Sequence, residues 1–299
     1  MPHVILPDAS SYPLFSRNPT RLIPGDSVAT QQLNELVVAY EMVGEGTPLV
    51  FIHQAATDQR IWYHQQAYFH SRYRVITIDV LGHGRVAWPP QELSIQQAAL
   101  RTRQLLEQLK TGPAFVIGVS MGAAVAMRIA FDAPALVRGL GLVSPWNYAS
   151  GDLQGLINRL FRLAETRDMG GHAELFLRYV SPATSGVDHS PEMERLRTLI
   201  LQQDAWAIAY TWVACLACDL RHALSQITAP SLVIAGLKDL FTPPYLARGV
   251  AEGLAEVELE IWEETGHFPF LEDPDRFNRR LEAFIQRCLA RARSASRQQ

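Results

Sequence analysis

Cysteine is scarce in this chain of 299 residues, where only Cys215, Cys218 and Cys288 occur. A small and odd number excludes a dense disulfide framework and favours a reducing compartment, so we expect a cytoplasmic protein. The first two have the C-x-x-C spacing, but no second pair and no matching histidines accompany them. Buried structural thiols are therefore the favoured interpretation, and we expect no metal and no organic cofactor.

Long apolar runs and a strong net charge are also missing. No stretch of about 18 apolar residues occurs, which argues against a membrane span. Pro2, Pro7 and Pro13 interrupt the N-terminus, which lacks the basic and apolar segments of an export signal. A net charge of −3 gives no electrostatic basis for binding nucleic acid or an anionic membrane. We expect a small-molecule substrate as the partner, and the sequence specifies no oligomeric state.

Apolar strands alternate with helices along most of the chain. Residues 1–34 are predicted to form an irregular leader. Strands are predicted at residues 36–42, 48–53, 73–79, 114–119, 137–144, 227–236 and 257–262. Helices are predicted at residues 61–69, 94–110, 121–130, 244–253 and 274–289. This alternation indicates an α/β protein with a mostly parallel central sheet and helices on both of its faces.

The alternation stops at Pro145 and resumes near residue 226, and the pattern between these points is mainly helical. We therefore predict a core domain of residues 1–144 and 226–299, and a helical cap of residues 145–225. Sheets of this kind bind ligands at the carboxyl ends of their strands, so the cap is expected to cover that edge.

One stretch joins a predicted strand to a predicted helix through a serine. The apolar run 114–119 leads into Gly118-Val-Ser-Met-Gly122, and helix-forming residues follow. The G-x-S-x-G pattern needs both glycines because the turn is strained and the helix passes close to neighbouring strands. A chance match is the alternative, but the strand before the motif and the helix after it argue against chance. Ser120 is therefore the predicted nucleophile, at a helix N-terminus that favours developing negative charge.

A serine hydroxyl needs a base within hydrogen-bond reach, and the base needs a group that holds its tautomer. Asp239 follows one predicted strand and His267 follows the next, so both are expected at the same sheet edge as Ser120. Alone, Asp239 could be a loop cap and His267 an ordinary loop histidine. Together with Ser120, in the chain order Ser, Asp, His, they predict a catalytic triad.

Four segments carry a family resemblance: residues 73–85, 118–122, 233–244 and 266–274. On these segments the chain resembles the α/β-hydrolase superfamily, in particular its single-cap esterases, lactonases and carbon–carbon hydrolases, over roughly residues 36–289. Within the superfamily, residues 58–62 and 238–244 are similar to those of 3-oxoadipate enol-lactonases and aminoacrylate hydrolases. The resemblance implies an α/β-hydrolase fold with a helical cap.

The same resemblance implies an oxyanion hole made of the backbone N–H groups of Ala55 and Met121. Preset donors of this kind stabilise the negative charge of a tetrahedral intermediate. Gln54 stands where the family usually has glycine, and a side chain there narrows the pocket or restricts the backbone. Trp146 and Phe268 are the aromatic pocket candidates, because each closely follows a core strand or the predicted catalytic histidine.

These residues predict a serine hydrolase that cleaves a small to medium, mostly apolar carboxylic ester or lactone. Ser120 would attack the carbonyl while His267 takes its proton and Asp239 orients the imidazole. Carbon–carbon bond hydrolysis of a diketone uses the same residues and is an alternative. A small-molecule sensor that binds under the cap without turning over is another.

Overall fold

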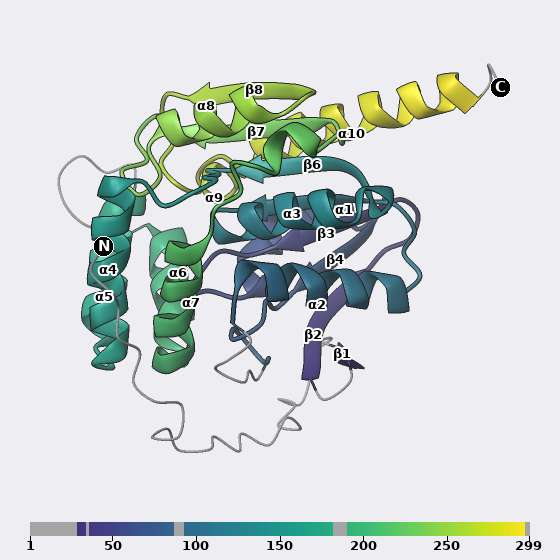
Figure 1. Ribbon diagram of the computed structural model, residues 1–299. Coiled ribbons are helices and arrows are strands. Elements are labelled where there is room, and N and C mark those ends of the chain that lie inside the picture. The colour runs from purple at the N-terminus through teal and green to yellow at the C-terminus, as the bar shows by residue number, and fades with distance from the viewer. Residues whose placement is uncertain (1–28, 34–35, 87–92, 182–189, 297–299) are drawn as a thin grey trace.

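The computed structural model describes residues 29–33, 36–86, 93–181 and 190–296. Eight strands of this part of the chain form one sheet in the order β1-β2-β4-β3-β5-β6-β7-β8 (Figure 1). Strand β2 is antiparallel to both of its neighbours, and all later pairs are parallel. The strands are β1 Ala29–Leu33, β2 Leu36–Val43, β3 Pro48–Ile52, β4 Arg74–Ile78, β5 Ala114–Val119, β6 Val137–Val143, β7 Ser231–Gly236 and β8 Val257–Trp262. The predicted mostly parallel sheet is confirmed.

Helices cover both faces of the sheet, as predicted. Helices α2 and α3 pack on each other, and α3 lies against β3, β5 and β6. Helices α1 and α10 also pack on each other, with α1 against β4 and α10 against β6. Helix α8 packs on β7 and β8. The core helices are α1 Tyr63–Phe69, α2 Ile95–Gln108, α3 Met121–Asp132, α8 Pro244–Gly253, α9 Pro269–Glu272 and α10 Pro274–Ser296, with 3-10 turns η2 Gln59–Trp62, η4 Pro134–Leu136 and η5 Leu224–Gln226.

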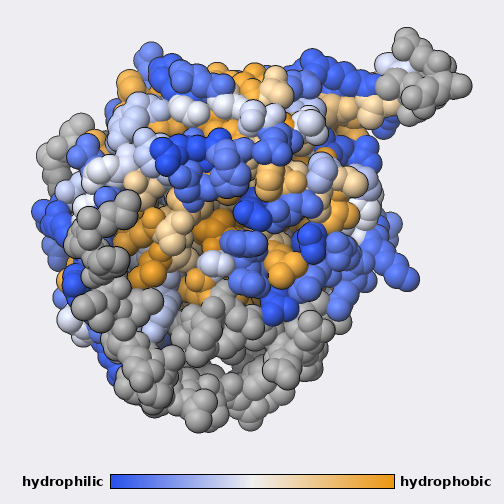
Figure 2. Space-filling model, viewed as in Figure 1, coloured by the Kyte–Doolittle hydropathy of each residue, from blue (hydrophilic) through white to orange (hydrophobic). Residues whose placement is uncertain are grey.

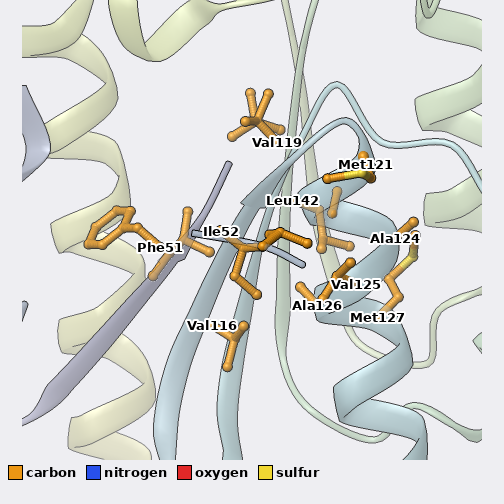
Figure 3. Close-up of a cluster of buried hydrophobic side chains, with 14 of the residues drawn as sticks. Phe51, Ile52, Val116, Val119, Met121, Ala124, Val125, Ala126, Met127 and Leu142 are labelled. Carbon is orange, nitrogen blue, oxygen red and sulfur yellow. The ribbon is translucent and has the colours of Figure 1, made fainter. Parts of the chain in front are cut away.

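The centre of the core lies where α3 meets β3 and β5. Both strands are buried along their whole length, because helices exclude water from the two faces of a parallel sheet. Figure 3 shows the side chain of Ala126 on the side of α3 that faces Ile52 and Val116. The small residues of α3 are fully buried, so the helix axis lies close to the sheet. This close packing fixes the position of the α3 N-terminus.

Four further helices form a separate layer beside the sheet (Figure 1). They are α4 Gly151–Glu165, α5 Met169–Val180, α6 Pro191–Leu201 and α7 Ala205–Ala217. Helix α4 packs on α5 and α7, and α5 packs on α6. The two ends of this insertion meet, because the N–H of Leu220 donates to the carbonyl of Asn147 at 2.7 Å and Tyr148 forms an antiparallel bridge with Asp219. The exact division into a core and a 145–225 cap stays a prediction.

The expectation of an irregular leader over residues 1–34 is wrong at its end. Residues 29–33 form the edge strand β1, which pairs with β2 from Ala29 opposite Tyr40 to Leu33 opposite Leu36. The sequence of this strand is Ala-Thr-Gln-Gln-Leu, without an apolar alternation. An edge strand takes its hydrogen bonds from one neighbour and needs no buried face, so the apolar pattern missed it. The rest of the leader lies outside the described residues.

The last helix is longer than predicted. Helix α10 continues past Leu289 to Ser296, although the sequence there is rich in arginine and small polar residues. Arg287 pairs with Glu258 at 2.7 Å, and Arg291 pairs with Glu256. These ion pairs connect the helix to the β8 end of the sheet, which sequence periodicity does not report.

Most of the face seen in Figure 2 is hydrophilic, with hydrophobic side chains gathered in its middle over the cap helices α6 and α7. Within the described ranges, no helix combines the length and the apolar character that crossing a bilayer requires.

Candidate active site

Ser120 lies at the tip of the turn between β5 and α3. Its backbone has φ 55° and ψ −114°, a strained conformation for a residue with a side chain. The Ser120 N–H donates to the carbonyl of Val143 at 2.9 Å, and its own carbonyl accepts from Ala123 at 3.0 Å as α3 begins. These bonds on both sides hold the strained turn in place.

The glycines on either side of Ser120 are required by the approach of other backbone atoms. A Cβ at Gly122 would overlap the carbonyl oxygens of Ile52 and His53 at the end of β3. A Cβ at Gly118 would overlap the carbonyl of Gly122 itself. The G-x-S-x-G pattern therefore reports that α3 starts in contact with the neighbouring strand.

Backbone strain gathers at this edge of the sheet. Besides Ser120, Ala56 has φ 62° and Ser144 has φ 46°. The three residues follow the carboxyl ends of β3, β5 and β6, which are adjacent in the sheet. Left-handed conformations of non-glycine residues cost about 1–3 kcal/mol each and cluster where a site needs them. The strain marks this edge as a functional site.

Asp239 and His267 are joined at the same edge. The imidazole Nδ1 lies 2.7 Å from Asp239 Oδ2, and both side chains are buried. The other carboxylate oxygen, Oδ1, accepts from the backbone N–H groups of Phe241 and Thr242, each at 2.9 Å. A carboxylate only accepts, so the proton of the neutral imidazole lies on Nδ1. The Nε2 atom is left as an unprotonated base, and it has no partner within the described part of the chain.

Thr242 and Ser144 complete this arrangement. The Thr242 hydroxyl donates to Asp239 Oδ2 at 2.8 Å and lies 3.0 Å from His267 Nδ1. The Ser144 hydroxyl donates to the His267 carbonyl at 2.9 Å. Since the residue before it, Val143, accepts from the Ser120 N–H, the end of β6 is bonded to both Ser120 and His267. Ser120 and His267 are therefore both bonded to the end of β6 although they are far apart in the chain, but within the described residues no hydrogen bond joins the Ser120 hydroxyl to His267 Nε2.

Glu272 holds the backbone on both sides of His267. One carboxylate oxygen accepts from the N–H of Gly266 at 2.6 Å and the other from the N–H of Phe268 at 2.8 Å. Burial raises the pKa of Glu272 to about 7, against the two N–H donors that favour the charged form. One side chain of α9 thus holds the backbone of the imidazole-bearing loop on both sides of His267.

The end of cap helix α5 bonds to the two loops that carry Asp239 and His267. The carbonyl of Tyr179 accepts from the N–H of Leu240 at 3.0 Å, and that of Val180 accepts from the N–H of His267 at 2.9 Å. The cap therefore contributes to the geometry of the Asp239–His267 pair as well as covering it.

Aromatic rings surround the imidazole of His267. Phe268, Phe241 and Phe176 have ring centroids 4.8, 5.3 and 6.4 Å from it, all in edge-to-face orientation. Trp212 of α7 packs on Phe176 and on Phe241. The cap and the core thus enclose the base in an apolar surrounding, and Ser120 is only 4% exposed.

The predicted oxyanion residues lie on both sides of the close approach between β3 and α3. Met121 is the first residue of α3, and Ala55 lies in the loop after β3. The neighbouring N–H of Ala56 already donates to His83 Nε2 at 3.1 Å. Of these two loop N–H groups, the one of Ala55 is therefore the better candidate for an oxyanion. The assignment of Ala55 and Met121 stays a prediction.

A buried polar cluster supports the loop after β3. His53 Nε2 accepts from the N–H of Val80 at 2.8 Å, and Asp79 accepts from the N–H groups of Gln59 at 2.9 Å and Arg85 at 3.1 Å. Burial lowers the pKa of His53 to about 4 and raises that of Asp79 to about 7, helped in Asp79 by the nearby charge of Asp58. Both hydrogen-bond donors to Asp79 are backbone N–H groups, so its carboxylate holds the loop backbone in place.

The pocket candidates differ in their surroundings. Phe268 packs against the imidazole, and Trp146 is buried just beyond the end of β6. Gln54 is also buried, in the loop after β3. Their roles in binding stay predictions. A separate surface hollow of about 550 Å³ lies on the cap between α4 and α5. Three arginines line it, and no residue of the predicted triad does. Its lining residues are Asn158, Arg159, Arg162, Leu163, Gly171, Glu174, Leu175 and Arg178.

The described residues contain no group of three or more His, Cys, Asp or Glu side chains that could hold a metal ion. Cys215 and Cys218 are free and buried, as the sequence interpretation expected. Burial raises the pKa of the Cys218 thiol to about 12, so it does not ionise at neutral pH.

Sequence reasoning did not identify Thr242, Glu272 or Phe176. Thr242 follows Asp239 by three residues, the spacing at which a side chain and an aspartate meet in a turn, so a signal was present. Glu272 follows His267 by five residues in an apolar segment, where a lone acid is a weaker signal. Phe176 belongs to the cap, and only the tertiary structure brings it to the imidazole.

Comparison with known proteins agrees with this geometry. The profile of the α/β-hydrolase family matches residues 49–280. The chain therefore belongs to the α/β-hydrolase family and has its fold.

The relatives include esterases and lactonases. An uncharacterised protein of Mycobacterium tuberculosis is 30% identical over 270 residues, covering 83% of this chain and 77% of the relative. The 3-oxoadipate enol-lactonase 2 of Acinetobacter baylyi is 28% identical over 240 residues, covering 80% and 88%. A thermophilic esterase of Thermogutta terrifontis has the same fold, with a TM-score of 0.79 at 22% identity over 88% of this chain and 99% of the other. The resemblance to the esterase and lactonase type is confirmed.

Proposed function

We propose that the protein is a serine hydrolase that cleaves small to medium, mostly apolar carboxylic esters or lactones through an acyl-enzyme on Ser120. The observation that carries the proposal is the 2.7 Å contact between Asp239 and His267 Nδ1. It leaves the imidazole Nε2 unprotonated and without a partner in the described structure, at the sheet edge where the strained turn holds Ser120. A base oriented by a carboxylate can activate a serine hydroxyl that comes within its hydrogen-bond reach, and we propose that Ser120 and His267 make this contact when substrate binds.

In this mechanism Ser120 attacks the substrate carbonyl while His267 takes the hydroxyl proton. The carboxylate of Asp239 stabilises the imidazolium, and the N–H groups of Ala55 and Met121 stabilise the oxyanion. His267 then gives the proton to the leaving alcohol, which departs and leaves the acyl-enzyme. In the second half, His267 takes a proton from water, which attacks the acyl carbon. The bond between the acyl carbon and Ser120 Oγ then breaks, His267 returns the proton to Ser120 Oγ, and the acid is released.

The apolar and small character of the substrate rests on the surroundings of the imidazole. Three phenylalanine rings lie around His267, and Ser120 is almost fully buried under the cap. An enclosed aromatic surrounding favours a compact acyl group over a long or charged one. The enol-lactonase and esterase relatives support the same class.

The test is the turnover of 4-nitrophenyl butyrate by the wild-type protein and by Ser120→Ala. We expect the variant to lose at least about 10⁴-fold in kcat, because the nucleophile is absent. Ser150→Ala is the matched control, since Ser150 lies at the start of α4 and its hydroxyl, within the described residues, hydrogen-bonds to the Tyr245 hydroxyl alone, at 3.3 Å. Its kcat should equal that of the wild type. Normal turnover by Ser120→Ala would refute the assignment.

A panel of substrates separates the remaining possibilities. Wild-type protein that cleaves a vinylogous diketone but neither an aryl ester nor an enol-lactone would be a carbon–carbon hydrolase. A single burst of one equivalent without further turnover would indicate a sensor. Continuous release of acid from the ester or lactone supports the proposed function.

A further inference from the structure

Gln54 is a buried side chain whose hydrogen-bonding atoms are unused. It is 1% exposed, and neither its Nε2 nor its Oε1 has a partner among the described residues. A buried polar group without a partner costs about 1–3 kcal/mol, so folded proteins rarely keep one without a use. A carboxamide with both ends unpaired in this way is a candidate for contact with a ligand.

The loop that carries Gln54 is held firmly by its backbone. The carbonyl of Gln54 accepts from His53 Nδ1 at 2.6 Å and from the Thr57 hydroxyl at 3.3 Å, and the N–H of Ala56 donates to His83. The carbonyl of the preceding residue packs against Gly122, just after the nucleophile. Gln54 therefore lies next to Ala55 on a rigid segment beside Ser120, where the acyl part of a substrate would bind.

The chemistry of the carboxamide selects the kind of group it would meet. It is neutral, with two N–H donors and one carbonyl acceptor. A substituent that both accepts and donates, such as an amide or a hydroxyl, would satisfy it. A carboxylate would satisfy only the donors and would need a cation. Three arginines of the cap, Arg159, Arg162 and Arg178, line the surface hollow between α4 and α5, whose lining includes no residue of the triad.

We propose that Gln54 is a specificity-determining residue that binds a neutral hydrogen-bonding substituent next to the scissile carbonyl. The preferred substrates are esters or lactones with an amide or hydroxyl group on the acyl part, within an otherwise apolar site. This proposal rests on the proposed function. It gives a purpose to the side chain that stands where the family usually has glycine.

The test compares two isosteric esters, 4-nitrophenyl acetamidoacetate and 4-nitrophenyl 4-methylpentanoate. The first carries an amide where the second carries only carbon. The quantity measured is the ratio of their kcat/KM values, polar over apolar, in the wild type and in Gln54→Met. Because the same two esters are used throughout, their intrinsic reactivities cancel when the ratios are compared. We expect the ratio to fall about tenfold in Gln54→Met, the effect of losing one hydrogen bond in a buried site.

Gln65→Met is the matched control. Gln65 is equally buried, but its Nε2 donates to the Phe270 carbonyl and to Asn278 Oδ1, each at 3.0 Å. We expect this variant to lose thermal stability and to keep the wild-type ratio. Gln54→Met should show the opposite pair of results, with a higher melting temperature, because an unpaired buried carboxamide is replaced by an apolar side chain of similar length.

Each outcome decides the proposal. A ratio that is unchanged in Gln54→Met, or a melting temperature that falls by several degrees, would overturn it and indicate a structural role. If methionine is not tolerated at this position, Gln54→Ala takes the same ratio test. Failure of the proposed function is seen separately, because wild-type protein would then cleave neither ester, and the present proposal would fall with it.

Discussion

Asp239 and Gln54 are both buried polar side chains at the carboxyl edge of the sheet, and their surroundings differ. The Asp239 carboxylate accepts from two backbone N–H groups, the Thr242 hydroxyl and the imidazole of His267. The carboxamide of Gln54 has no partner in the described chain. The Asp239 carboxylate is therefore fully hydrogen-bonded without substrate, whereas the Gln54 carboxamide keeps unused hydrogen-bonding capacity.

The difference has a physical purpose in an enzyme of this kind. Orienting a base requires that every competing geometry be excluded, which dense hydrogen bonding achieves. Glu272 and the end of α5 extend this bonding to the backbone around His267. Recognising a substrate requires the reverse, namely groups that find their partners only when the substrate binds.

Among the changes considered, Asp239→Asn is expected to lower kcat most, because it alters the hydrogen-bonded Asp239–His267 pair. The amide would place donors against the His267 Nδ1–H, so the imidazole is expected to move its proton to Nε2 and to stop acting as a base. We expect kcat for an aryl ester to fall about 10⁴-fold, as happens when this carboxylate becomes an amide in other serine hydrolases. Steady-state kinetics at neutral pH measure the effect, with circular dichroism to check folding.

The matched control is Asp219→Asn, which changes an exposed carboxylate paired with Arg221 at 2.6 Å. Its kcat should stay at the wild-type value. A loss of less than tenfold in Asp239→Asn would mean that the orientation of His267 does not depend on the carboxylate.

Gly236→Ala tests the packing that brings the two catalytic loops together. A Cβ at this position would overlap the carbonyl oxygens of Thr265 and Gly266, just before His267. We expect the loop to shift, with a loss of about 2 kcal/mol in the free energy of unfolding and about 100-fold in kcat. Urea titration and ester kinetics measure the two effects.

Gly249→Ala gives the opposite sign and serves as the control. Gly249 lies within α8, and a Cβ there meets nothing within 4 Å. Alanine should stabilise the helix by about 0.5–1 kcal/mol and leave kcat unchanged. Equal effects of the two substitutions would show that Gly236 is not a close-approach position.

An effect that depends on pH, and that changes stability without changing kcat, is expected at His172 in the cap. Its Nε2 accepts from the Trp212 N–H at 2.9 Å, and burial lowers the pKa of His172 to about 4, with nearby Asp168 opposing the shift. The unfolded chain binds the proton below about 6.5, and the folded chain only below about 4. Its contribution to stability is therefore full above pH 6.5 and is lost as the pH falls towards 4, by up to about 3 kcal/mol.

The measurement compares wild type and His172→Phe by urea unfolding at pH 7.5 and at pH 4.5. The wild type should lose stability relative to the variant between these values. Asp79 and Glu272, whose pKa values are each raised to about 7, change the free energy of unfolding in the opposite direction, since they favour the folded state as the pH falls. Both groups are present in both proteins, so their contributions cancel in the difference. A difference that does not change with pH would show that His172 is not held neutral.

The fold and the approximate place of the site follow from local patterns. The strand and helix periodicity predicted every parallel strand, and the rule that parallel strands end at one edge predicted that Asp239 and His267 would meet. The edge strand β1 was missed because its polar sequence carries no burial signal, and the extent of α10 was missed because ion pairs to the β8 end support it.

The sequence by itself determined the turn at Ser120, because a turn of this kind requires the preceding strand and a glycine on each side of the serine. It also predicted which two loops carry Asp239 and His267. Only the tertiary structure decided that Thr242 and Glu272 hold those loops, that cap residue Phe176 reaches the imidazole, and that Gln54 lacks a partner among the described residues. Such facts depend on which distant atoms come within 3–4 Å, and residue order does not encode a contact until packing creates it.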